Sequence, residues 1–130
     1  ALRYITRSGN ISVVQTLDAL GDPVRRRLVE LLADGERSAG QLATAVGAEF
    51  GISQPAASRH LRVLREAGVV ESEPQGAVRL YSVRPEAFDE LERWSRRIRR
   101  FWDGRLDALE TEIARGARES RAQGTTKEQR

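Results

Sequence analysis

Residues 52–70 read Ile-Ser-Gln-Pro-Ala-Ala-Ser-Arg-His-Leu-Arg-Val-Leu-Arg-Glu-Ala-Gly-Val-Val, and this segment has the pattern of a short helix with two different faces. Ser53 is a good N-cap, because its hydroxyl can accept a hydrogen bond from a free backbone N–H of the first turn. Pro55 falls in that turn, where its missing N–H costs little. Apolar residues recur at steps of four and three, which predicts a buried face formed by Ala57, Leu61 and Leu64.

The opposite face of this helix carries hydrogen-bond donors, namely Gln54, Ser58, Arg59 and Arg62. Glutamine can bind adenine through two hydrogen bonds, arginine can bind guanine or phosphate, and serine can bind either. No acidic side chain interrupts this face before Glu66. The pattern therefore favours a recognition helix that lies in a groove of double-stranded DNA. The alternative is a solvated amphipathic helix rich in arginine.

The composition fits one helical domain of 130 residues. Charged residues make up 32% of the chain, above the roughly 25% that is usual, and hydrophobic residues make up 39%, enough for a modest core. The net charge is +3, and Lys127 is the only lysine. Arginine suits two-pronged contacts to phosphate and guanine, although genomic base composition can produce the same bias.

Several classes of site are excluded or disfavoured by the residues that the chain lacks. It has no cysteine, which excludes disulfides and thiolate metal sites within the chain, and its single histidine cannot build an ordinary zinc site alone. No glycine-rich phosphate loop or nucleophile–base pair suggests an enzyme, so we expect no catalytic residue and no cofactor. Without an apolar run of 18 residues or a secretory signal, we expect a cytoplasmic protein with no membrane partner.

Three helices are expected before residue 52. A mobile arm over 1–10 precedes a first helix over about 11–20, since Val13, Val14, Leu17 and Leu20 have helical spacing. Asp22-Pro23 is a strong start signal for the second helix. Ser38 begins the third, with Gln41 as its capping-box partner. The turn before Ser53 is either unusually long, starting at Gly47, or the third helix runs one turn further.

A β-hairpin is expected after the recognition helix. The segments 69–73 and 78–83 are rich in β-branched residues, and Pro74-Gln75-Gly76 between them is a turn signal. Arg79 on this hairpin would reach DNA beside the groove that the helix occupies. The fold class is therefore mainly α with a small β-hairpin, a winged helix–turn–helix domain over 11–84.

A long final helix is expected over 85–115, followed by a disordered tail over 116–130 that lacks apolar residues beyond alanine. A single small domain cannot easily cover its apolar stripe, so we expect a homodimer formed by the first and last helices. The alternative is that this helix folds back onto its own domain. The expected interface is Val13, Val14, Leu17, Leu91, Trp94, Ile98, Phe101, Trp102, Leu106 and Leu109. Trp94, Phe101 and Trp102 form either the dimer core or a pocket for a hydrophobic effector.

Four motifs in this order resemble the ArsR/SmtB family of bacterial transcriptional repressors, over roughly residues 13–83. They are Leu17-Asp18-Ala19-Leu20-Gly21-Asp22-Pro23, Arg25-Arg26-Arg27-Leu28, Ile52 to Leu61, and Leu64-Arg65-Glu66-Ala67-Gly68-Val69-Val70. The resemblance implies a homodimer that binds an operator near its own promoter, and in many members an effector releases the DNA. Metal-sensing members carry cysteine on the third helix, or histidine and carboxylate ligands on the last. This chain lacks both patterns, so we expect the branch that does not sense metals.

The expected DNA-binding residues are Ser53, Gln54, Pro55, Ser58, Arg59, His60, Arg62 and Arg79. His60 lies at the edge between the two helix faces. It either packs with one ring nitrogen bonded to backbone, or contacts a phosphate, and a metal ligand is the weakest of its three readings. The leading hypothesis is a DNA-binding repressor, probed by Gln54, Ser58, Arg59, Arg62 and Arg79. The rival is a winged-helix protein–protein interaction module that does not bind DNA. Regulation, if any, is expected from an organic effector or a protein partner.

Overall fold

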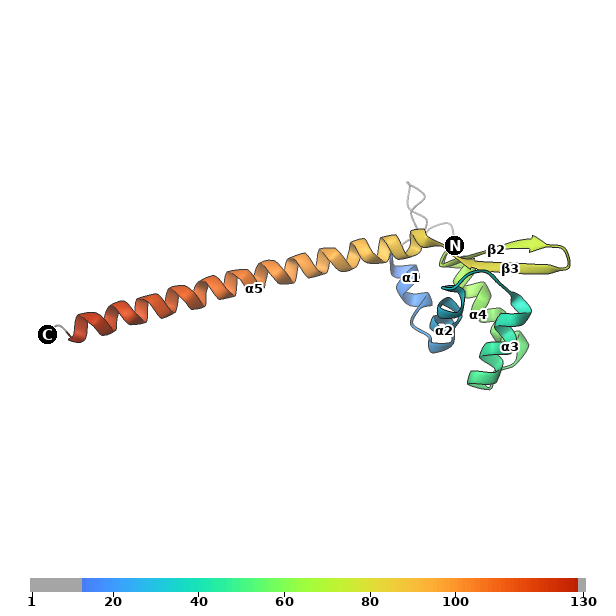
Figure 1. Ribbon diagram of the computed structural model, residues 1–130, viewed down its shortest axis with the longest axis horizontal. Helices are drawn as coiled ribbons and strands as arrows, with labels where there is room; N and C mark the ends of the chain where they lie inside the picture. The colour runs from blue at the N-terminus through green and yellow to red at the C-terminus, as the bar shows by residue number, and fades with distance from the viewer. Residues whose placement is uncertain (1–12, 129–130) are drawn as a thin grey trace. The chain divides into compact units, whose positions relative to one another are not determined.

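The computed structural model describes residues 13–128, and the side chains of residues 13–124. The expected arm at 1–10 and the final two residues lie outside the described residues. The elements in chain order are α1 (Val13–Ala19), α2 (Pro23–Leu32), β1 (Arg37–Ser38), α3 (Ala39–Phe50), α4 (Gln54–Glu66), β2 (Val70–Gln75), β3 (Val78–Val83) and α5 (Pro85–Glu128) (Figure 1). The chain divides into two units, Ala1–Arg93 and Trp94–Arg130.

The helices begin where the capping residues predicted. Asp22 accepts hydrogen bonds from the backbone N–H groups of Val24 and Arg25, at 2.8 and 3.2 Å, and Pro23 opens α2. Ser38 and Gln41 form the full capping box of α3, with both reciprocal hydrogen bonds present. Each cap satisfies donors that the first helical turn would otherwise leave unpaired.

The helix–turn–helix between α3 and α4 has an ordinary short turn. Helix α3 continues through Phe50, and Gly51 ends it in the left-handed conformation with φ of 67°. Only residues 51–53 separate the two helices, so the open question from the sequence is resolved in favour of the longer third helix. A residue with a Cβ would be strained at Gly51, which explains why glycine ends α3 here.

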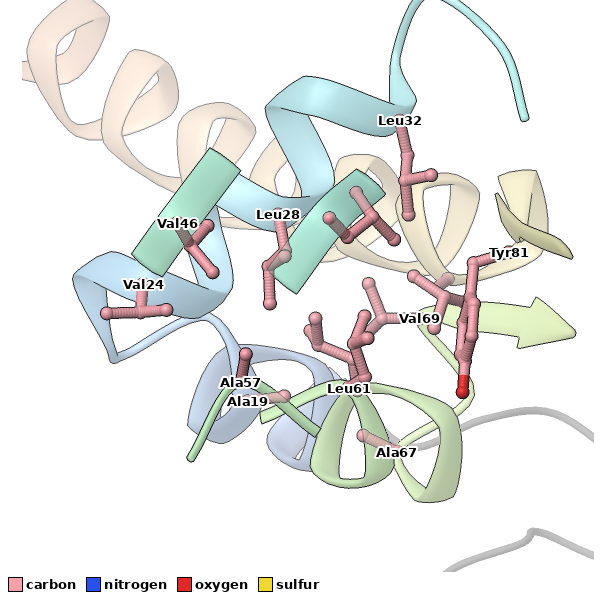
Figure 2. Packing of buried hydrophobic residues seen from close by; sticks show 14 residues of the cluster. Ala19, Val24, Leu28, Leu32, Val46, Ala57, Leu61, Ala67, Val69 and Tyr81 are labelled. Atoms are coloured by element: carbon pink, nitrogen blue, oxygen red, sulfur yellow. The ribbon is translucent and has the colours of Figure 1, made fainter. Parts of the chain in front are cut away.

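The core of the first unit is built from α2, α3, α4 and the start of the sheet. Leu28, Leu42, Val46 and Leu64 have no exposed surface, and Leu61 is also buried. Figure 2 shows Leu28 and Val46 turned toward the side of α4 that carries Ala57 and Leu61. The predicted inner face of α4 is therefore confirmed, and its burial fixes which side of the helix faces outward.

The wing is a three-stranded antiparallel sheet with the order β1-β3-β2. The hairpin was expected, but β1 was not, because it has only two residues and is defined by its pairing of Arg37 with Tyr81 and Ser38 with Leu80. The expected position of the hairpin turn was wrong. Pro74 lies in β2 opposite Arg79, and the turn is Gly76-Ala77, with φ of 63° at Gly76. Proline is tolerated there because β2 is an edge strand.

Helix α5 does not stop at residue 115. It continues to Glu128, through the segment where the sequence suggested a disordered tail. Residues 114–123 contain no proline and are rich in alanine, arginine, glutamate and glutamine, which have high helix propensity. Propensity favours this extension even though the segment has no apolar stripe.

The core makes a prediction about two adjacent residues of α4. Leu64 is fully buried, whereas the side chain of Val63 is 38% exposed. We expect Leu64→Ala to lower the free energy of unfolding by about 2–5 kcal/mol, because it leaves a cavity, and Val63→Ala to cost well under that. Urea denaturation at one fixed protein concentration measures both. Equal losses for the two variants would show that the buried face of α4 is assigned incorrectly.

Candidate nucleic-acid interface

The outer face of α4 presents the expected donors together. Gln54, Ser58, Arg59 and Arg62 are all exposed, on the side opposite the buried residues Ala57, Leu61 and Leu64. Ser53 caps the helix, its hydroxyl accepting from the N–H of Ala56 at 3.3 Å, and Pro55 lies in the first turn. The helix N-terminus therefore exposes an amide, a hydroxyl and two guanidinium groups on one surface. This is the arrangement that can hydrogen-bond to base edges and phosphates.

The first turn of α4 lies beside α3. A shallow hollow separates the two helices and is lined by Gly40, Ala43, Thr44 and Gln54. The small side chains on α3 leave the amide of Gln54 accessible from outside. Gln54 is thereby free of steric cover from the neighbouring helix.

Arg79 lies on the exposed wing, on strand β3. Its guanidinium donates a hydrogen bond to the hydroxyl of Ser72 on the adjacent strand, at 2.9 Å. This contact orients the side chain across the hairpin, and an arginine guanidinium has five N–H donors in all. Arg79 therefore retains donors for a phosphate, as a wing arginine beside a DNA groove requires.

His60 is held by side chains of α2, and not by a backbone group as one interpretation of the sequence had it. Its Nδ1 atom lies 3.3 Å from Nη1 of Arg25 and 3.9 Å from a carboxylate oxygen of Asp22. Arg25 also donates through Nε to the carbonyl oxygen of Ala19, at 2.6 Å. Because arginine can only donate, the neutral ring with its proton on Nε2 fits this contact. The ring joins the recognition helix to the corner between α1 and α2.

Asp22 is electrostatically stabilised at this corner. Burial alone would raise the pKa of its carboxyl group, but backbone N–H groups of Arg25 and Val24 donate to it and cationic neighbours surround it. These interactions outweigh burial and hold the pKa of Asp22 below its ordinary value. The carboxylate thus stays ionised as the cap of α2 and as a neighbour of His60.

The arginine cluster at 25–27 is engaged within the protein. Arg25 binds the Ala19 carbonyl, Arg26 donates to the carbonyl of Leu20 at 2.9 Å, and Arg27 forms a two-pronged ion pair with Glu49. The sequence marked this cluster only as a local concentration of charge. Its signal was the position of all three residues one turn after the Asp22 cap, where they can reach back to the end of α1 or across to α3.

The residues expected at a dimer interface are mostly exposed in the single chain. On α1, Val14 and Leu17 are exposed and Val13 is partly buried. On α5, Leu91 is partly buried, and the exposed members are Trp94, Ile98, Phe101, Trp102, Leu106 and Leu109. The guanidinium of Arg105 lies 5.9 Å from the ring centres of both Phe101 and Trp102, at cation–π distance.

Two further searches of the described residues found nothing. Between residues 13 and 128 there is no group of three or more His, Cys, Asp or Glu side chains placed to hold a metal ion. Within the same range, no helix is both long enough and apolar enough to cross a membrane.

Comparison with known proteins gives consistent matches. Residues 20–73 match a family model described as a helix-turn-helix domain. The transcriptional repressor SdpR of Bacillus subtilis is 33% identical over 76 residues, which cover 58% of this chain and 80% of SdpR. The crystal structure of the ArsR family regulator RHA00566 superposes with a TM-score of 0.62 at 25% identity, covering 70% of this chain and 90% of that one.

A third similar protein is described as a homodimer. It is the winged helix–turn–helix DNA-binding domain (fragment 1–100) of Mb0332 from Mycobacterium bovis, a possible ArsR-family regulator. Its solution structure has a TM-score of 0.51 and 29% identity, and covers 72% of this chain and 81% of that fragment. With the exposed donor face of α4 and the wing, these matches establish that the chain belongs to the ArsR family of winged helix–turn–helix, DNA-binding transcriptional regulators.

Proposed function

We propose that this regulator is a repressor that binds an inverted-repeat operator as a homodimer. Its family consists of transcriptional regulators, and the chain is not an enzyme. The single observation that carries the proposal is the outer face of α4, where Gln54, Ser58, Arg59 and Arg62 are exposed with no acidic residue among them. A protein–protein interaction module would have no need of this donor set.

The roles of the individual residues follow from their places on α4 and the wing. Gln54, Ser58 and Arg59 lie toward the helix N-terminus, the end that recognition helices direct at base edges. Arg62, one turn further on, and Arg79 on the wing are suited to holding phosphates. Ser53 and Pro55 shape the first turn.

His60 serves as a positioning residue. Its ring is only 22% exposed and contacts Arg25 and Asp22, so a direct phosphate contact is the less favoured of its two roles. By joining α4 to the corner between α1 and α2, it restrains rotation of the recognition helix about its own axis. The bases that Gln54 and Arg59 can reach depend on that rotation.

Two arginines on α4 allow a matched test of DNA reading. We expect Arg59→Ala to weaken operator binding by about 1–3 kcal/mol and to relax preference at one base position. Arg62→Ala should weaken binding about equally on all sequences and make it less dependent on salt, because it removes a phosphate contact. Binding-site selection and salt-dependent affinity measurements on both variants separate the roles. If Arg59→Ala keeps both affinity and sequence preference, the assignment fails.

A homodimer is supported by two observations. Two copies related by a twofold axis would place two recognition helices in successive major grooves, about 10 base pairs apart, which requires an inverted repeat. The exposed apolar residues of α1 and α5 provide a surface that a second copy could cover, and the similar domain of Mb0332 is homodimeric.

Sedimentation tests the dimer. We expect the full chain to sediment as a dimer at micromolar concentration, because the two tryptophans and their apolar neighbours are costly to leave in water. A chain ending before Pro85 should be a monomer or an aggregate, with weak operator affinity. A full-length chain that stays a monomer would disprove the homodimer.

Regulation by zinc or a similar metal is not what the ligands of this chain favour. Zinc sites commonly need about four Cys or His ligands, whereas the chain has no cysteine and one histidine. A dimer would bring two His60 side chains, each on its own recognition helix. We propose control through an organic effector or a protein partner that acts on α5.

Metal titration distinguishes these forms of control. We expect zinc, nickel and cobalt at micromolar concentration to leave the protein–operator complex intact, because the chain supplies too few soft ligands. The control is His60→Ala, provided that this variant still binds DNA. Release by metal that a chelator reverses, and that is lost in the control, would contradict the proposal.

A further inference from the structure

The second unit of the chain carries an exposed apolar stripe along α5. Its members are 36–65% exposed: Trp94, Ile98, Phe101, Trp102, Leu106, Leu109 and Ile113. Both tryptophans of the chain belong to it. A continuous apolar surface of this kind marks an interaction site, because burying it releases water from large apolar groups.

The spacing of the stripe is nearly symmetric about Trp102. Ile98 and Leu106 lie four residues before and after it, and Leu91 and Ile113 lie eleven residues before and after it. Trp94 and Leu109, eight before and seven after, differ by one position. When two identical helices pair in opposite directions, a residue before the twofold axis faces the residue equally far beyond it. The stripe is therefore complementary to itself when it is reversed.

The repeat length fits the same pairing. Leu91, Trp102 and Ile113 recur at intervals of eleven residues. Eleven residues correspond to about 3.67 residues per turn over three turns, close to a straight α-helix. Two such stripes can stay in contact along nearly straight helices, without the left-handed supercoil that a seven-residue repeat requires.

The charges on either side of Trp102 have opposite sign. Before it come Arg96, Arg97, Arg99 and Arg100, and after it come Asp103, Asp107, Glu110 and Glu112, with Arg105 as the exception. Antiparallel pairing about Trp102 brings the basic segment of each copy alongside the acidic segment of the other. A parallel pair in register would instead align the four arginines of both copies, which is unfavourable.

We propose that α5 pairs with α5 of a second copy in the antiparallel direction, with the twofold axis passing at Trp102. This inference rests on the homodimer of the proposed function and adds the direction and the register of the pairing. It assigns Trp102 to a contact with its own counterpart, and it pairs Ile98 of each copy with Leu106 of the other.

Cysteine cross-linking tests the direction, because the natural chain has no cysteine and each introduced thiol is unique. Full-length Ile98→Cys and Leu106→Cys proteins, carrying tags of different size, are mixed, allowed to exchange subunits, and oxidised. The expected product is a disulfide-linked heterodimer of the two variants. Each variant alone should cross-link poorly, because the two copies of position 98 would lie about 12 Å apart along the helices, beyond the reach of a disulfide.

The matched control is Arg100→Cys, whose position faces away from the stripe and should give only background cross-linking. Efficient self-linking of Ile98→Cys and of Leu106→Cys, with no heterodimer product, would show a parallel pair and overturn the proposal. No cross-link above the control would overturn it as well, and would leave an effector or the chain's own first unit as the cover of the stripe. Operator affinity and sedimentation of the same preparations show separately whether DNA binding and the dimer itself have failed.

Discussion

The burial of one face of α4 against α2 and α3 is the contact on which the rest of the first unit depends. Ala57, Leu61 and Leu64 occupy it with almost no exposed surface. Since consecutive residues of a helix are separated by about 100°, burying these three residues directs Gln54, Ser58 and Arg59 outward without any further interaction. The donor face is thus a consequence of packing.

The contacts around His60 refine what packing leaves loose. A face of three aliphatic residues resists lifting of the helix more strongly than a small rotation of it. The link through Arg25 to the carbonyl of Ala19 crosses three helices with polar contacts of fixed geometry. Directional hydrogen bonds add orientation to an apolar seam that mainly supplies stability.

Much of this architecture could be predicted from the sequence, for reasons that are local. The caps at Asp22, Ser38 and Ser53 and the stripe of α4 depend on residues within one or two turns, so their signals are complete in a short window. Strand β1 could not be predicted, because two residues become a strand only through their partners on β3. The neighbour of His60 was missed for the same reason, since Arg25 is 35 positions away. The end of α5 was misplaced because an apolar stripe was taken as a requirement for the helix, whereas residue propensity is enough to continue it.

Pro74 in the wing has a consequence for how the protein behaves when it is concentrated. Strand β2 is at the edge of the sheet, and an exposed edge with a full row of backbone donors and acceptors can recruit strands from other molecules. Pro74 has no N–H to offer, and Glu71 and Glu73 on the same strand add like charges that repel a second copy of that edge. The wing can therefore project from the domain toward a ligand without acting as a template for aggregation.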